Sequence, residues 1–146
     1  MLLVAFFLSA ESARAQDETG SQRITLMQHV INERPVLAEL LTTAGLAPAL
    51  SGSTDYTLLA PPEASLQVLK GQSAEKIRSV LAMHIIKGKY KATDFKEGAK
   101  VPTYGGETLY VCRRKGSTLL NGVKLQAGDK EFRNGIVQEI EGFLQP

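Results

Sequence analysis

The stretch Leu81-Ala82-Met83-His84-Ile85-Ile86-Lys87-Gly88-Lys89-Tyr90 marks the point at which the hydrophobic pattern of this chain changes. Up to it, apolar residues recur at helical spacing. Beyond Gly88, short apolar segments alternate with turn signals. Helices first and strands later predict an α+β fold and argue against the alternating βαβ pattern of a nucleotide-binding domain.

Upstream of this stretch the pattern predicts helices with one buried strand between them. Pro35 separates two helices, and Gly45 is placed to end the second one. Tyr56 to Ala60 is predicted to form a buried strand that stops at Pro61-Pro62. Further helices are predicted over Glu63 to Leu69 and after an N-cap at Ser73. The apolar stripes of the first, second and last helices are Leu26, Met27, Val30 and Ile31; Val36, Leu37, Leu40 and Leu41; and Ile77, Val80, Leu81, His84 and Ile85.

Downstream, turn signals divide the chain into candidate strands. Asn121-Gly122 and Asn134-Gly135 are the strongest, because both central positions of the favoured hairpin turn need positive φ. The other turn signals are Tyr104 to Glu107 and Arg114 to Ser117. The predicted strands are Thr108 to Arg113, Thr118 to Leu120, Val123 to Leu125 and Ile136 to Glu141.

The N-terminus predicts export. An apolar run from Leu2 to Leu8 precedes Ala13-Arg14-Ala15, a pattern typical of a secretory signal peptide over residues 1–15. Residues 16–23 are predicted to be a disordered lead and residues 24–146 the domain, secreted or periplasmic after cleavage near Ala15. The alternative is that the first residues form an amphipathic helix of the domain itself.

Composition offers little for catalysis or for a cofactor. The chain has a net charge of +2, two histidines and one cysteine, so no intramolecular disulfide can form. The spacings that hold zinc are missing from the sequence, and Cys112 lies in an apolar strand pattern typical of a packing residue. We therefore expect neither an enzyme nor a bound cofactor or metal, and the low net charge gives no argument for nucleic acid.

Two local features remain as candidate sites. His84 lies on an apolar stripe, which favours a core histidine over a ligand. Lys87, Lys89 and Lys91 alternate along the chain, so an extended backbone would place them on one side. They are interpreted either as solvated surface or as a patch that binds an anionic partner.

Three segments together resemble the fasciclin domain family. They are Tyr56 to Leu66, with strand, Ala-Pro and helix; Leu81 to Tyr90, with its His, paired isoleucines, Gly and Tyr; and Asn134 to Pro146. The resemblance covers Ile24 to Pro146 and implies a wedge of two β-sheets with helices packed against it. It implies adhesion or extracellular recognition rather than catalysis.

The resemblance also suggests contact residues and partners. In adhesion members a Tyr-His pair is assigned to integrin contact; this chain has Met83-His84 there, and Gln138 replaces a frequent His. The candidate binding residues are Met83 and His84, at the position that the resemblance indicates, together with Lys87, Lys89 and Lys91 of the alternating basic stretch. The expected partner is an extracellular or envelope protein or polysaccharide, bound by a monomer without a permanent membrane span. The alternative function is a secreted carrier of a hydrophobic small molecule.

Overall fold

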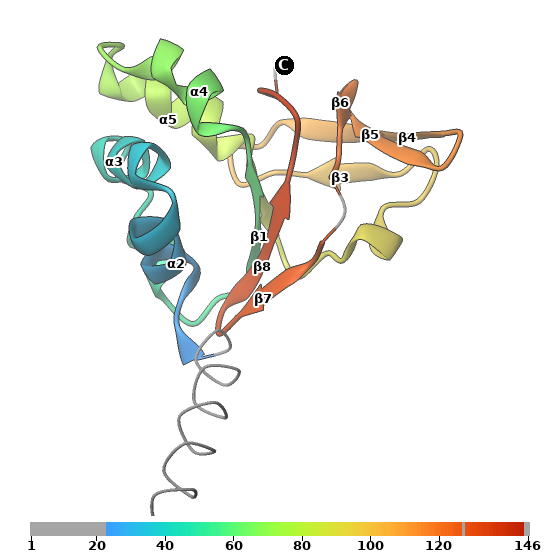
Figure 1. Ribbon diagram of the computed structural model, residues 1–146, viewed down its shortest axis with the longest axis horizontal. Helices are drawn as coiled ribbons and strands as arrows, with labels where there is room; N and C mark the ends of the chain where they lie inside the picture. The colour runs from blue at the N-terminus through green and yellow to red at the C-terminus, as the bar shows by residue number, and fades with distance from the viewer. Residues whose placement is uncertain (1–22, 127, 145–146) are drawn as a thin grey trace, which may run out of the picture.

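Helices form one layer of the molecule and two four-stranded sheets form a wedge beside them (Figure 1). The computed structural model describes residues 23–126 and 128–144. The predicted signal peptide and nearly all of the predicted lead lie outside these residues. The helical elements are α2 (Leu26–Glu33), α3 (Pro35–Thr43), η1 (Ala49–Ser51), α4 (Glu63–Leu66), η2 (Gln67–Leu69), α5 (Ala74–Ala82) and η3 (Ala92–Asp94).

The first sheet has the strand order β2-β1-β8-β7 and the second β3-β4-β5-β6. The strands are β1 (Tyr56–Ala60), β2 (Ile85–Lys87), β3 (Lys100–Pro102), β4 (Thr108–Arg114), β5 (Ser117–Leu120), β6 (Val123–Lys124), β7 (Lys130–Phe132) and β8 (Gly135–Glu139). β1 and β8 are parallel, and the other pairs are antiparallel. Isolated bridges join Ile86 to Thr103 and Leu125 to Ile140, which links the two sheets. The predicted α+β fold with a wedge of two sheets is confirmed.

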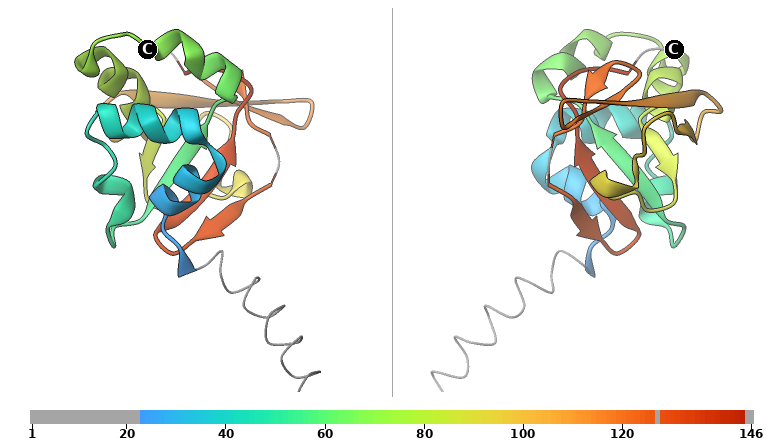
Figure 2. Two further views of the ribbon diagram at one scale, coloured as in Figure 1. Left: turned by 60° about the vertical axis from the view of Figure 1, so that its left-hand side comes forward. Right: turned by 90° about the vertical axis from the view of Figure 1, so that its right-hand side faces the viewer.

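Both faces of the first sheet are buried, which explains why β1 is apolar from Leu58 to Ala60, with Thr57 as its one buried polar residue. Leu58 and Ile85 pack on the helices, whereas Leu59 and Ile86 pack between the sheets. Successive residues of a strand point to opposite faces of the sheet, so one residue of each neighbouring pair packs in each of the two hydrophobic cores. The two views of Figure 2 show the helices on one side of this sheet and the second sheet on the other.

The helix ends follow local hydrogen bonding. Thr25 and Gln28 form a capping box at the start of α2. The carboxylate of Glu63 on α4 accepts the N–H groups of Val36 at 3.0 Å and Leu37 at 3.2 Å, and so caps α3 from outside. Ser73 caps α5 as predicted, through Lys76 N–H at 3.2 Å.

Several local predictions are corrected. Helix α5 ends at Ala82, because Ile85 pairs with Leu58 of β1; the predicted stripe through His84 and Ile85 therefore does not continue as a helix. Ile31, predicted to face the core, is 57% exposed. The short strands β2, β3 and β7 were not among the predicted strands.

Asn134-Gly135 is also not the centre of a hairpin turn. Phe132 pairs with Gly135, so the two turn residues are Arg133 and Asn134. The Asn134 side chain is instead a buried clamp: its Oδ1 accepts from Leu26 N–H at 2.8 Å and its Nδ2 donates to the carbonyls of Leu50 and Gly52, each at 2.9 Å. Asn121 and Gly122, by contrast, have φ of 48° and 83° and form the predicted turn.

Candidate functional site

The basic segment, residues 87–91, leaves the edge of the first sheet and is held there by one threonine. Lys87 ends β2 and pairs with Tyr56. The hydroxyl of Thr57 donates to the Gly88 carbonyl at 2.7 Å and accepts Tyr90 N–H at 2.8 Å. Thr57 is fully buried, so these two bonds fix the segment to β1 with little competition from water.

All three lysines of the basic segment are exposed, while Tyr90 turns inward and stacks on Phe95 with ring centroids 5.4 Å apart. Within residues 23–126 and 128–144, none of the three ammonium groups forms an ion pair. Gly88 has a φ of 93°, which bends the chain. The segment is therefore not extended throughout, as it would have to be for the alternating lysines to lie on one side. The three charges are thus available to a partner, on a bent and anchored backbone.

Met83 and His84 lie apart from this surface. They are 2% and 1% exposed, respectively. The prediction that His84 is a core histidine is confirmed, and contact of either side chain with a partner stays a prediction. His84 Nδ1 lies 2.9 Å from the Val80 carbonyl, and Nε2 accepts Leu144 N–H at 3.1 Å.

Burial sets the protonation state of His84. A carbonyl can only accept, so Nδ1 carries the proton and Nε2 is the acceptor. Burial lowers the pKa of His84 to about 4, against a smaller opposing effect of the Val80 carbonyl. The ring is therefore neutral at pH 7 and binds the end of the described chain to the start of β2.

Gln138 also holds the basic segment, a role that its position in the closing motif did not predict. Its side chain is fully buried on β8. Nε2 donates to the Tyr90 carbonyl at 3.0 Å and to Asp129 Oδ1, which also accepts Ala92 N–H at 2.8 Å. The sequence signal for this role was a glutamine between apolar residues of a central strand, because a buried amide needs hydrogen-bond partners.

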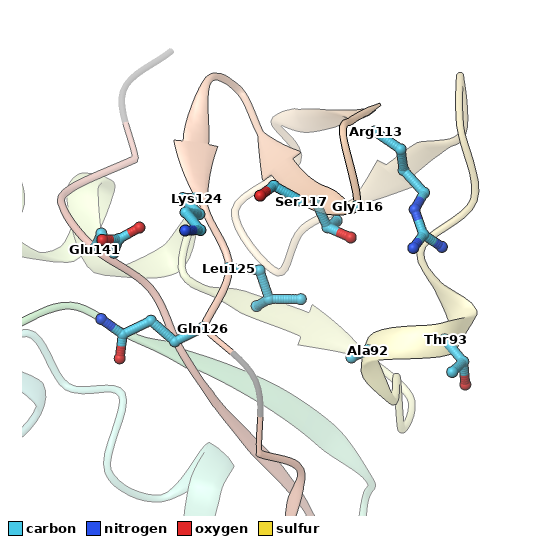
Figure 3. Close-up of a pocket in the computed structure, with 10 residues that line it drawn as sticks. Ala92, Thr93, Arg113, Gly116, Ser117, Lys124, Leu125, Gln126 and Glu141 are labelled. Carbon is cyan, nitrogen blue, oxygen red and sulfur yellow. The ribbon is translucent and has the colours of Figure 1, made fainter.

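A pocket of about 600 Å³ opens where the basic segment ends (Figure 3). It lies between η3, the β4–β5 hairpin and the chain after β6. The lining residues are Ala92, Thr93, Arg113, Gly116, Ser117, Thr118, Lys124, Leu125, Gln126 and Glu141. Most of these side chains are polar or charged, so the pocket favours a polar ligand over an apolar one.

A family model for the fasciclin domain matches residues 32–146. The chain belongs to the fasciclin domain family. The fold is similar to that of a solved domain pair from the insect cell adhesion molecule Fasciclin I, with a TM-score of 0.67 at 15% identity, over 87% of this chain and 52% of that one.

The chain spans a small part of two of the relatives it matches and about two thirds of a third. The chain is 26% identical to Homo sapiens periostin over 78% of its own length and 14% of periostin's. It is 30% identical to the Oryctolagus cuniculus transforming growth factor-beta-induced protein ig-h3, over 74% of this chain and 16% of that protein. For protein sll1483 of Synechocystis the identity is 24%, over 75% of this chain and 66% of the relative.

The described part of this fasciclin domain offers no cluster of three or more side chains suited to a metal ion. In the same part, no helix has the length and apolar character that crossing a membrane demands. The exposed lysines of the basic segment and the polar pocket beside them are the candidate groups for recognition.

Proposed function

We propose that this chain is an exported, non-catalytic interaction module of the fasciclin type, which binds an anionic extracellular or envelope partner through its basic segment. The observation that carries the proposal is the availability of Lys87, Lys89 and Lys91: all are exposed and free of ion pairs in the described structure, on a backbone fixed by Thr57. Clustered charges of one sign attract an oppositely charged partner and accelerate encounter.

The alternative function, a carrier of a hydrophobic small molecule, finds no support in the pocket described above. Its walls carry two cationic side chains, one carboxylate and several hydroxyls. An apolar ligand that covered these groups would remove their hydration without offering hydrogen bonds in return, which costs free energy.

The test is a salt series on the wild type and on the triple variant Lys87→Gln, Lys89→Gln, Lys91→Gln, measured against matrix or cell-envelope extracts. Wild-type binding should weaken as salt shortens the screening length to about 8 Å at physiological ionic strength. The triple variant should lose association rate more than it gains dissociation rate, with stability changed by no more than about 0.5 kcal/mol. Equal and salt-insensitive binding by both proteins would remove the basic segment from the proposal.

Export has its own measurement. The intact mass of the native protein should correspond to an N-terminus at Gln16. Recovery of the uncut chain from the cytosol would contradict export while leaving the binding surface untouched.

A further inference from the structure

The pocket beside the basic segment has a firmly held rim. Its residues Ala92 and Thr93 directly follow Lys91 and belong to η3. Asp129 accepts the N–H of Ala92, and the fully buried Phe95 anchors the other end of η3 in the core between the sheets. A ligand at this site therefore meets a wall that is already in place, which reduces the entropy lost on binding.

Two unpaired cations lie at opposite ends of the pocket. Arg113 comes from β4 and Lys124 from β6, and the register places β5 between them. Figure 3 shows Arg113 reaching toward η3 on one side of Leu125 and Lys124 on the other. Neither side chain forms an ion pair in the part of the chain that the structure describes.

The Arg113 guanidinium keeps its full hydrogen-bonding capacity. The Glu97 carboxylate accepts the backbone N–H of Arg113, so that contact positions the strand without using the side chain. A free guanidinium presents two parallel N–H donors that fit one carboxylate. Arg113 is accordingly the stronger anchor for an acidic group.

The lining residues other than the two cations favour a ligand with many hydroxyl groups. Thr93, Ser117 and Thr118 supply hydroxyl groups and Gln126 an amide, each able to donate and to accept. Glu141 lies at the Lys124 end, where its carboxylate accepts hydrogen bonds and repels a second anion. The acidic group of a ligand is thereby directed to Arg113, with hydroxyls toward Lys124 and Glu141.

We propose that this pocket binds a single carboxylate-bearing sugar residue of an acidic polysaccharide. The proposal rests on the anionic partner of the proposed function and names its chemistry. The pocket's size, about 600 Å³, falls within the range of small-ligand sites. An acidic peptide would also satisfy the two cations, but it offers the hydroxyls, Gln126 and Glu141 only one backbone N–H and one C=O per residue, whereas a sugar ring carries several hydroxyls that each donate and accept, so the lining favours the sugar.

Calorimetric titration with defined probes tests this assignment. The probes are tetragalacturonate, its full methyl ester, which keeps the hydroxyls without the charge, and tetraglutamate, which keeps charge without sugar hydroxyls. Arg113→Gln should weaken tetragalacturonate binding about tenfold, the loss of one charge-assisted bidentate contact. The matched control is Arg114→Gln, which removes the same charge one residue away, on the opposite face of β4; it should change affinity less than about twofold.

Each outcome decides between the assignments. Weaker binding of both the ester and tetraglutamate, together with selective loss in Arg113→Gln, supports the pocket. Equal losses in the Arg113 and Arg114 variants, or tetraglutamate binding as tightly as the sugar, overturns it. If tetragalacturonate does not bind while extracts still bind through the lysines in a salt-dependent way, the pocket assignment fails and the proposed function stands.

Discussion

His84 Nε2 accepts a hydrogen bond from the backbone N–H of Leu144 across a distance of 3.1 Å. With the Nδ1 bond to Val80, the imidazole links α5, the start of β2 and the segment after β8. Both ring nitrogens are satisfied inside the core, so the ring serves the fold through its neutral form.

His84→Ala should destabilise the protein by about 1–3 kcal/mol, because the Leu144 N–H loses its acceptor in a buried site, while the Val80 carbonyl keeps only the N–H of Met83. Urea denaturation measures the change, and hydrogen exchange at the Leu144 amide should quicken in the variant. An unchanged midpoint combined with lost partner binding would instead make His84 a contact residue.

Stability should fall as the pH drops from about 6.5 toward 4. Burial lowers the pKa of His84 from 6.5 to about 4, so in this window the unfolded chain binds a proton that the folded protein does not. The contribution of neutral His84 is complete above pH 6.5, and about 3 kcal/mol of it is lost by pH 4. The stability advantage of the wild type over His84→Gln, from urea curves at pH 7 and 4.5, should shrink accordingly; a constant difference would contradict this.

Gln138→Glu should destabilise the fold by about 2 kcal/mol or more, because an oxygen would replace the Nε2 donor opposite the Tyr90 carbonyl and Asp129. The loss should be larger at pH 8 than at pH 5, where the new carboxyl can hold a proton. Thermal melts at the two pH values measure it. The control Gln67→Glu, at an exposed position in η2, should melt like the wild type.

Glu63→Ala should cost about 1–2 kcal/mol, the usual range for a lost helix cap, since the Val36 and Leu37 N–H groups lose their acceptor. Glu39→Ala, on α3 itself, is the matched control. Glu39 is exposed and only 3.7 Å from Lys70, a surface pair worth little, so its loss should stay below about 0.5 kcal/mol. Equal denaturation midpoints for the two variants would argue against the cap.

Gly135→Ala should abolish stable folding or cost about 4 kcal/mol or more. A Cβ at Gly135 would overlap the Tyr56 carbonyl oxygen and come within 2.6 Å of Leu26, in the centre of the first sheet. Gly142→Ala is the control, because nothing lies within 4 Å of a Cβ there. Circular dichroism of both variants checks the contrast, and a folded Gly135→Ala protein with the wild-type melting temperature would refute it.

The predictable parts of the fold are those where one local cause dominates. β1 has the predicted bounds because Pro61-Pro62 stops a strand that is buried on both faces. Asn121-Gly122 forms its turn because both residues adopt positive φ. Asn134-Gly135 is the same dipeptide, but its structure is determined by contacts with residues far away in the sequence. The Asn134 side chain accepts the Leu26 N–H, and the missing Cβ of Gly135 leaves room for the Tyr56 carbonyl.

The candidate site was less accessible to sequence reasoning. A solvated surface was one of the two interpretations of the three lysines, and all three are exposed; their alternation predicted an extended segment, and the bend at Gly88 that interrupts it was not predicted. Arg113, Lys124 and Glu141 lie in separate segments, and only strand pairing brings them to one pocket. The spacing of these residues along the chain therefore does not predict the pocket.

The parallel pairing of β1 with β8 has a consequence for biosynthesis. Tyr56 finds its partner in Gly135, so the central sheet cannot close until nearly all of the described chain has left the ribosome. Contacts this distant in sequence slow folding and keep the nascent chain open. A polypeptide that stays unfolded during its synthesis is a suitable passenger for a translocation channel, which admits chains before they fold.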